Sequence, residues 1–312
     1  MIEENAIEKE QENERVRVSV IMPIYNAVDY LAEAIDSVLR QTIAEIELIC
    51  VDDGSTDNTE ETVREWMRET DDFAIQYFQK ENGGLHTAYN EAIAHIETEL
   101  CVCIDSDDYM PNDAVEKILR FWEENGSDEV AGIVGLDYTT EGNVIGDPLP
   151  DKKTVNLIDL LTGKYKINNG DRTNVVRTEL YKKYAPMKVF PGEKNFNPHY
   201  LHLQISQGYD FLVLNENLRF VEYQPGGMSD SMWKQYKSSP RSFAETRKLY
   251  LSFPNTGFKF KLRHSIHFVS SCILARDMSM LKESSKMFLT ALAVPMGLAL
   301  SILVIIKTKT KK

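Results

Sequence analysis

The stretch Val51-Asp52-Asp53-Gly54-Ser55-Thr56-Asp57 follows directly on an apolar run that begins at Ile46 and has the length of a buried strand. Two other runs share this design: Ser19-Val20-Ile21-Met22-Pro23-Ile24-Tyr25-Asn26 lies upstream, and Asp105-Ser106-Asp107-Asp108 follows a third apolar run downstream. In an open α/β sheet, the ends of parallel strands deliver polar groups to one edge, where nucleotides bind. The three runs therefore predict a nucleotide site at such an edge.

Apolar periodicity predicts the elements around these runs. We expect strands at 16–22, 46–51, 74–79, 100–104 and 130–138, and helices at 29–40, 85–96 and 111–125, with another through Val63 that Ser55 or Thr56 would cap. Strands and helices alternating at short spacing predict a parallel sheet with helices on both faces, and right-handed crossovers place the strand ends at one edge. Residues 139–172 are expected to be mostly loop.

Composition limits the class of protein. The chain has 312 residues, of which 43% are apolar and 27% charged, enough for one large domain with an appendage. Its net charge of −13 argues against general nucleic-acid binding. The cysteines fit no zinc pattern, so we expect buried free thiols in a reducing compartment. The acidic, polar N-terminus does not have the pattern of a signal peptide, so we expect the catalytic part to face the cytoplasm.

The acidic run at 105–108 predicts a metal site. Three carboxylates within four residues repel one another unless a cation or hydrogen-bond donors neutralise them. Mn²⁺ and Mg²⁺ favour a few carboxylates combined with phosphate oxygens, which is what Asp105, Asp107 and a nucleotide diphosphate would supply. The alternative is an exposed acidic turn. No P-loop, dinucleotide fingerprint or hydrolase elbow is found.

The Asp52–Asp57 run has two interpretations. A carboxylate after a strand can bind a nucleoside while Gly54 lets the backbone approach. The same residues also form a favourable turn and helix cap.

Taken together, these motifs resemble those of family-2 glycosyltransferases with the GT-A fold, most specifically over 16–125. The resemblance implies that Tyr25 flanks the nucleobase, that Asp53 binds the nucleoside, and that Asp105-Ser106-Asp107 is the metal motif. The nucleotide-binding residues it implies are Pro23, Tyr25, Asn26, Asp53, Asn82, Gly83 and Asp105, with Asp105 and Asp107 on the metal. Tyr89 stands where the family usually has arginine, so a phosphate contact from that arginine is absent.

The resemblance leaves the catalytic base open. Inverting members usually place a Glu-Asp pair at a helix start, and the matching positions here are Asn197 and Pro198, neither of which can act as a base. Glu193 is the preferred candidate, His199 is the second and Asp210 the third, because a carboxylate or an imidazole can accept the acceptor's proton. An ion pair of Glu193 with a basic group is the structural alternative.

The expected function is inverting transfer of a sugar from a nucleotide-diphosphate sugar, most simply a UDP-sugar, to a saccharide acceptor. The later part of the chain resembles bacterial capsular and exopolysaccharide transferases. The C-terminal tail would place the site at a membrane, so we expect a lipid-linked oligosaccharide as acceptor. Two alternatives remain: a nucleotidyltransferase that makes the activated sugar, and a non-catalytic, membrane-tethered module that binds nucleotide sugar. The first would need a basic, glycine-rich loop after the first strand, which Tyr25 to Asp29 does not provide.

The C-terminal region predicts an association with the membrane. Residues 288–306 contain no charge, and lysines follow them, so a monotopic or re-entrant helix broken near Pro295 would lie on the cytoplasmic leaflet. A buried soluble helix is the alternative. Residues 257–272 interleave basic and aromatic residues, which fits either an interfacial helix or a packing arm.

We therefore expect four regions. They are a disordered acidic tail at 1–15, a nucleotide-sugar-binding half at 16–125, an acceptor-binding half at 126–240 and a helical, membrane-associating extension at 241–312.

Overall fold

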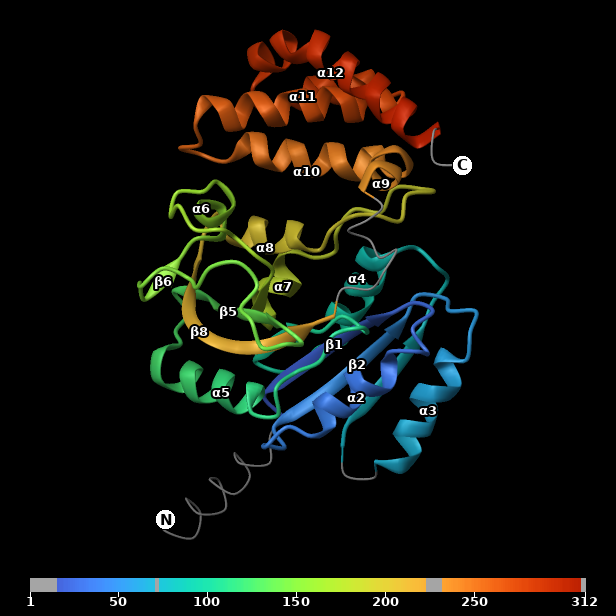
Figure 1. The fold of residues 1–312 in the computed structure, drawn as a ribbon, viewed down its shortest axis with the longest axis vertical. Helices are drawn as coiled ribbons and strands as arrows, with labels where there is room; N and C mark the ends of the chain where they lie inside the picture. The colour runs from blue at the N-terminus through green and yellow to red at the C-terminus, as the bar shows by residue number, and fades with distance from the viewer. Residues whose placement is uncertain (1–15, 71–72, 223–231, 310–312) are drawn as a thin grey trace. The chain divides into compact units, whose positions relative to one another are not determined.

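A computed structural model describes residues 16–70, 73–222 and 232–309 (Figure 1). Its centre is an eight-stranded sheet with the order β3-β2-β1-β4-β7-β5-β8-β6. Four parallel strands build the first half: β1 (Val18–Ile24), β2 (Ile46–Asp52), β3 (Ile75–Gln79) and β4 (Leu100–Cys103). β1 and β2 are buried along their whole length, as expected for strands covered on both faces.

The second half of the sheet is mixed. It contains β5 (Val130–Thr139), β6 (Thr154–Val155), β7 (Arg172–Arg177) and β8 (Asp210–Val221). β7 runs antiparallel to both β4 and β5, whereas β5 and β8 are parallel with register shifts along their pairing. The predicted GT-A-like α/β fold, mostly parallel, is confirmed, and 139–172 holds only β6, the short helix α6 (Leu157–Leu161) and the start of β7.

Helices cover both faces of the sheet, as predicted. The core of one face packs against α2 (Leu31–Leu39), α3 (Thr59–Glu69) and α5 (Ala114–Asn125). The other face carries α4 (Leu85–His95) and α7 (Thr178–Tyr184) (Figure 1). These helices meet through the hydroxyls of Tyr89 and Tyr181, which lie 2.9 Å apart. The position where the family usually has arginine is thus a buried tyrosine.

Two predicted helix starts are wrong. α5 begins at Ala114 rather than at Pro111, because Pro111 lies in a turn whose carbonyl accepts the amide of Ala114. α3 begins at Thr59 with Asn58 at its N-cap, so Ser55 does not cap it; the Ser55 hydroxyl instead accepts a bond from the β1 end. Tertiary contacts therefore override the local capping preference in this loop.

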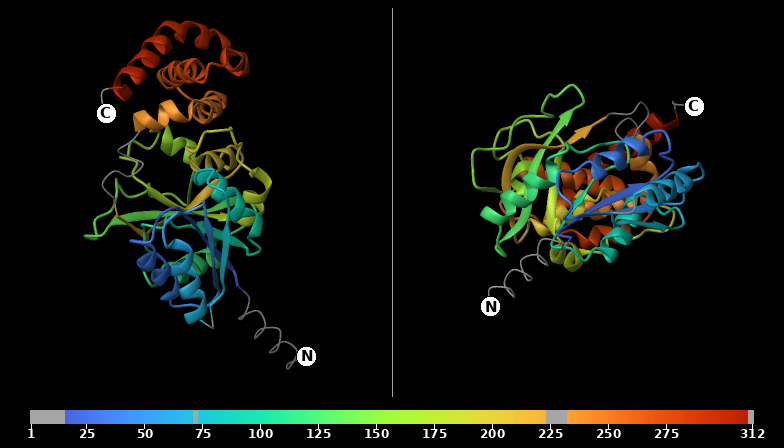
Figure 2. Two further views of the ribbon diagram at one scale, coloured as in Figure 1. Left: turned by 90° about the vertical axis from the view of Figure 1, so that its right-hand side faces the viewer. Right: turned by 90° about the horizontal axis from the view of Figure 1, so that it is seen from below.

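The second compact unit is helical. It contains α8 (His199–Ile205), α9 (Met232–Ser238), α10 (Pro240–Ser252), α11 (Phe258–Ala275), the 3₁₀ helix η2 (Met278–Glu283) and α12 (Met287–Lys309). α11 lies between α10 and α12 (Figures 1 and 2). It buries Lys261, His264 and Phe268, and the Lys261 ammonium caps the end of α10 by donating to the Leu251 carbonyl at 2.7 Å. The packing-arm interpretation of 257–272 is therefore the one the structure supports.

α12 is continuous through Pro295, so the predicted break there is wrong. The helix is held by packing, since Gly297 rests against Val269 of α11 and the Ser301 hydroxyl bonds to that of Ser270 at 3.1 Å. Its packed face consists of Thr290, Ala293, Gly297, Ser301 and Val304. Large apolar side chains fill the exposed face: Phe288, Leu292, Leu298, Ile302 and Ile306 are each at least half exposed.

The compact units do not follow sequence order. Of the described residues, the sheet unit takes in those up to Asn82, Thr87–Pro186 and Gly208–Glu222, and the helical unit takes in Gly83–His86, Met187–Gln207 and those from Met232 onward. The boundaries expected at 125 and 240 thus coincide with neither unit and remain a prediction about donor and acceptor halves.

Replacing Gly297 with alanine should loosen the contact between α11 and α12. A Cβ atom there would lie 2.5 Å from Val269 Cγ1, whereas alanine itself favours a helix over glycine by about 1 kcal/mol. We expect net destabilisation of about 1–3 kcal/mol from overpacking, measured by urea denaturation in detergent. Gly257→Ala, where no atom lies within 4 Å of the added Cβ, is the control. A Gly297→Ala variant that is more stable than the wild type would contradict the close packing of Gly297 against α11.

Candidate nucleotide-sugar site

The register of the parallel strands places the predicted residues at one edge of the sheet. Ile24 pairs with Asp52, and Asp52 pairs with Gln79, so β1, β2 and β3 end at the same level. The amide of Ile104 bonds to the Ile21 carbonyl at 3.0 Å, which brings the acidic run after β4 to the same edge. The predicted convergence of the strand ends is confirmed.

Asn26 joins the end of β1 to the loop after β2. Its amide donates to the Ser55 hydroxyl at 2.9 Å, and its side-chain Oδ1 accepts the Thr56 amide at 2.8 Å. These bonds hold Asn26 at a φ of +49°, which asparagine tolerates better than most residues. Its neighbour Tyr25 is half exposed, so the ring is accessible to a planar partner, while Pro23 is buried inside β1.

The two adjacent aspartates have different surroundings. Asp52 is fully buried and structural: its carboxylate accepts the Ser55 amide at 2.7 Å and the Tyr77 hydroxyl at 2.8 Å. Burial, together with the hydrogen bond to the Asp52 carboxylate and its charge, raises the pKa of Tyr77. Asp53 instead forms an ion pair with Lys80, whose ammonium lies 2.8 Å from Asp53 Oδ1 and 2.8 Å from the Thr87 hydroxyl.

Lys80 was not among the residues selected from the sequence. The signal for it was its position directly after the third predicted strand, the same kind of position that singled out Asp53.

Gly54 brings the Asp53 loop against the segment after β3 that contains Lys80 and Asn82. Its φ is +74°, and an added Cβ would lie 2.8 Å from the Asn82 amide nitrogen and 3.0 Å from the Lys80 carbonyl oxygen. Glycine is therefore required for this close approach. The Asn82 side-chain oxygen is buried and has no hydrogen-bond partner within the described residues, which leaves an acceptor at this edge.

The acidic run forms a tight turn after β4, closed by a bond from the Asp108 amide to the Asp105 carbonyl at 3.0 Å. Asp105 is half exposed, and burial together with the Asp105 charge raises the pKa of Asp107. Asp108 is buried, and its carboxylate accepts the Glu222 amide at 3.2 Å. Burial raises the pKa of Asp108 to about 8, against the opposing effect of Arg219.

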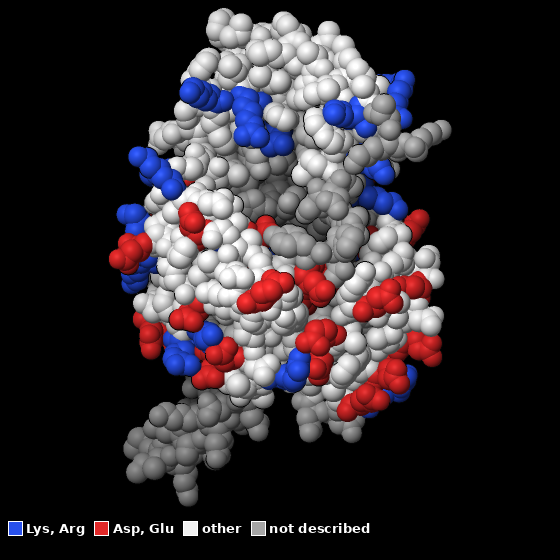
Figure 3. Space-filling model, viewed as in Figure 1, with Lys and Arg blue, Asp and Glu red and all other residues white. Residues whose placement is uncertain are grey.

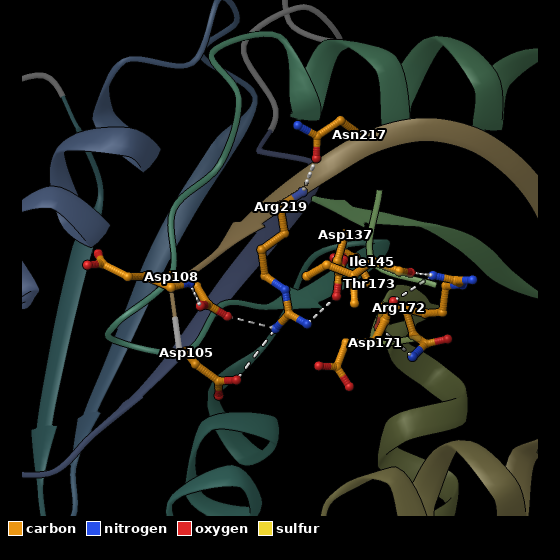
Figure 4. Close-up of polar contacts among 11 residues, drawn as sticks. Asp105, Asp108, Asp137, Ile145, Asp171, Arg172, Thr173, Asn217 and Arg219 are labelled. Atoms are coloured by element: carbon orange, nitrogen blue, oxygen red, sulfur yellow. Dashed lines mark hydrogen bonds and ion pairs between the residues drawn. The ribbon is translucent and has the colours of Figure 1, made fainter. Parts of the chain in front are cut away.

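Arg219 of β8 reaches this turn from the other half of the sheet (Figure 4). Its guanidinium bonds to the fully buried Asp137 of β5, and Asp137 also accepts the Thr173 hydroxyl at 2.6 Å. Sequence reasoning missed this pair. The available signal was Asp137 itself, a single carboxylate inside an otherwise apolar strand, because such a charge requires a buried partner.

The donor set fits Mn²⁺ or Mg²⁺ when phosphate oxygens complete it. Within the described ranges, no group of three or more His, Cys, Asp or Glu side chains is arranged to hold a metal by itself. Asp105 and Asp107 provide two hard carboxylate ligands on a partly exposed turn, and both ions commonly bind through one or two carboxylates plus substrate phosphates. Metal binding at this turn remains a prediction.

The base candidates belong to different parts of the molecule. Glu193 and His199 lie in the helical unit, together with Gly83, whereas Asp210 begins β8 in the sheet unit and accepts the Asn156 amide group at 2.9 Å. Glu193 is buried because it caps α10. One carboxylate oxygen accepts the Arg241 amide at 2.9 Å, and the other accepts the amide and hydroxyl of Ser242 at 2.8 and 2.9 Å. This role stabilises the helix start.

His199 is the first residue of α8, and its amide donates to Asn197 Oδ1 at 2.8 Å. Its ring contacts that of His202, with the centroids 5.7 Å apart. Burial and the neighbouring His199 lower the pKa of His202 to about 3, so His202 is neutral. The imidazole of His199 itself is only partly buried.

Charge is distributed unevenly along the chain. Residues 241–312 contain thirteen Lys and Arg against three Asp and Glu, although the whole chain carries −13. On the face drawn in Figure 3, acidic side chains are numerous over the sheet unit, while basic ones dominate the described C-terminal helices.

The fold and the strand-edge residues define a GT-A-type α/β protein, and comparison with solved structures agrees. The chain matches residues 1–349 of S. aureus TarS bound to UDP-GlcNAc with a TM-score of 0.59 and 19% identity, covering 91% of this chain and 90% of that one. It also matches a mannosyltransferase of Pyrobaculum calidifontis, PcManGT, bound to GDP-Man and Mn²⁺, with a TM-score of 0.57 and 17% identity, covering 92% and 87% of the two chains. At these identities the likeness establishes the fold.

Residues 19–172 match the model of glycosyl transferase family 2, and the chain belongs to that family over these residues. Two relatives are the glycosyltransferase GlyA of Streptococcus pneumoniae, 32% identical over 140 residues, and the poly(ribitol-phosphate) beta-glucosyltransferase of Bacillus spizizenii, 26% identical over 260 residues. The matched regions are 44% and 78% of this chain, but only 20% and 40% of the lengths of these relatives.

Proposed function

We propose that this chain transfers a sugar from a UDP-sugar, with inversion at the anomeric carbon, to a saccharide acceptor carried on a membrane lipid. The observation that carries the proposal is the strand edge at which Tyr25, Asp53 and the acidic turn at 105–108 converge. The UDP-GlcNAc bound by TarS and the beta-glucosyltransferase among the relatives support the choice of donor class. The resemblance of the later part of the chain to bacterial capsular and exopolysaccharide transferases supports a proposed role in such a synthesis.

In this proposal the residues of the sheet unit bind and orient the donor. The Tyr25 ring flanks the base, and Asp53, held by Lys80, accepts a hydrogen bond from the nucleoside. Asp105 and Asp107 would hold Mn²⁺ or Mg²⁺, which when bound neutralises the charge that develops on the departing diphosphate. A catalytic base, for which Glu193 is the first candidate, accepts the proton of the attacking acceptor hydroxyl.

One observation favours a non-catalytic alternative. Asn197 and Pro198 replace the expected Glu-Asp pair, and both Glu193 oxygens are already engaged by the start of α10. A module that binds nucleotide sugar without transferring it would retain the strand edge and lack the base. Release of UDP in the presence of a lipid-linked acceptor separates the two functions.

Asp107→Asn should reduce turnover by about 10²–10³-fold, the range for loss of one preorganised electrostatic contact to developing charge. The fold should be retained, because this side chain is partly exposed at a turn. Turnover would be measured as UDP release with Mn²⁺ added to EDTA-washed protein. Asp151→Asn, at an exposed loop position, is the matched control. Equal turnover of Asp107→Asn and the control would contradict the metal role of Asp107.

The base is tested by comparing Glu193→Gln with His199→Gln. If Glu193 only caps α10, the glutamine variant should lose about 1 kcal/mol of unfolding free energy and keep its turnover. A base variant instead loses turnover while its affinity for UDP, measured by calorimetry, is unchanged. We retain Glu193 as the first candidate and His199 as the second. Full turnover in both variants would exclude both residues and make Asp210 the next to test.

We also propose that α12 lies in the cytoplasmic leaflet of the membrane. Among the described residues, α12 is the one helix long and apolar enough to span a bilayer, with a mean hydropathy of 2.5. However, its middle packs on α11, whose first two turns carry the exposed Lys259 and Arg263. A crossing would carry this basic helix toward the hydrocarbon, whereas an in-plane α12 keeps the charges at the headgroups.

Serine substitutions at Phe288, Leu292 and Ile302 together should weaken binding to vesicles by at least tenfold, since each removes exposed apolar area from the lipid-facing side. Flotation of the full chain with phosphatidylcholine vesicles, with and without phosphatidylglycerol, measures this, and anionic lipid should strengthen binding. Val189→Ser, at an exposed apolar position outside α12, is the control. Wild-type protein that does not float with either vesicle would contradict the proposal.

A further inference from the structure

Arg219 connects the acidic turn to the interior of the sheet. One terminal nitrogen of its guanidinium, Nη2, bonds to Asp137. The other, Nη1, lies 3.3 Å from Asp108 Oδ2 and 3.5 Å from Asp105 Oδ2. A planar guanidinium can bridge carboxylates in this way because its donors point in fixed directions.

The three carboxylates that Arg219 contacts differ in their exposure to solvent. The side chain of Asp137 is 0% exposed, that of Asp108 is 5% exposed and that of Asp105 is 49% exposed. Arg219 is therefore fixed at its inner end, where Thr173 also orients Asp137, and its weakest contact is with the outermost carboxylate. Figure 4 shows this chain of contacts running from the Asp137 side to Asp105.

We propose that Arg219 is a positioning residue for the metal ligand Asp105. A half-exposed aspartate samples several side-chain orientations in water, and the Arg219 contact restricts them through Oδ2. Within the described residues, Asp105 Oδ1 has no hydrogen-bond partner, so it remains available to a divalent cation. The inference rests on the proposed metal-dependent transferase function and adds a residue from β8 to it.

The variant Arg219→Lys separates the effect of positioning Asp105 from the effect of positive charge near the turn. The ammonium keeps the positive charge near the acidic turn, but as a single point it cannot bridge Asp137 and Asp105 together. Changes in the outer contacts of a metal ligand typically alter metal affinity by about 10–100-fold. We therefore expect Arg219→Lys to weaken Mn²⁺ binding about tenfold.

Arg172 offers a matched control. It lies on β7, which is separated from β8 by β5, and it is partly buried. It donates to the carbonyl oxygens of Ile145 (Figure 4) and Asp147 rather than to the acidic turn. Arg172→Lys should leave Mn²⁺ affinity unchanged. An equal loss of affinity in both arginine variants would show a general effect on the sheet and overturn the proposal.

The decisive experiment is a double-mutant cycle on the full chain, with free Mn²⁺ measured by electron paramagnetic resonance in the presence and absence of UDP. The four proteins are the wild type, Arg219→Lys, Asp105→Asn and the double variant. If Arg219 acts through Asp105, Arg219→Lys should change affinity less than about twofold in the Asp105→Asn background. Additive losses, or unchanged affinity in Arg219→Lys alone, would overturn the proposal.

Two further measurements keep the outcomes distinct. Thr173→Val loosens the Asp137 anchor without changing charge, and should weaken Mn²⁺ binding in the same direction by a smaller factor; it decides the question if Arg219→Lys fails to fold. Wild-type UDP binding and sugar transfer are assayed separately. A wild type that transfers sugar equally well in EDTA keeps the transferase function and overturns the metal site together with this proposal, whereas normal Mn²⁺ binding in Arg219→Lys overturns the proposal alone.

Discussion

The parallel pairing of β1 with β2 and β4 is the constraint on which the site depends. Because Ile24 pairs with Asp52 and Ile104 bonds to Ile21, the chain leaves three strands at nearly the same level. The side chains that follow can then reach one another: Asn26 bonds across to the β2 loop. A register slip of one residue in β1 would turn each of its side chains to the opposite face of the sheet. Every later feature of the edge, including the acidic turn, requires this register.

That register also concentrates negative charge, and the structure compensates only part of it. Asp53 has Lys80 as a partner, and Arg219 is shared among Asp105, Asp108 and Asp137. One guanidinium cannot neutralise both Asp105 and Asp137, so a net negative charge remains at the turn beside Asp107. Two opposite unit charges about 4 Å apart attract each other by about 4 kcal/mol at an effective dielectric constant of 20. The residual charge is what makes a divalent cation with a diphosphate a chemically suitable occupant, and it explains why the exposed carboxylates are the ones expected to bind it.

The sequence predicted the strand edge because each part of it is local: an apolar run followed by polar residues indicates both a strand and its end. The Arg219–Asp137 pair could not be predicted in the same way, since its members are 82 residues apart and meet only through the irregular register of β5 and β8. Glu193 shows the same limit, because its hydrogen-bonding partners begin a helix 48 residues later. The predicted starts of α3 and α5 were wrong, because residues in the preceding loops make other hydrogen bonds. What periodicity cannot supply, in each case, is the identity of a distant partner.

α12 shows how residue size adds information that hydrophobicity alone lacks. The helix is apolar on all sides, so composition does not distinguish a buried helix from one that contacts lipid. In a soluble core, large apolar residues face inward and gain the most from leaving water. α12 has the reverse arrangement: Gly297 and Ser301 face α11, while Phe288 and Leu292 face outward. Small residues at the helix contact are characteristic of packing in lipid, where large side chains gain nothing by turning inward. The basic residues around these helices favour a surface with anionic headgroups, so residue size and charge independently favour the same location.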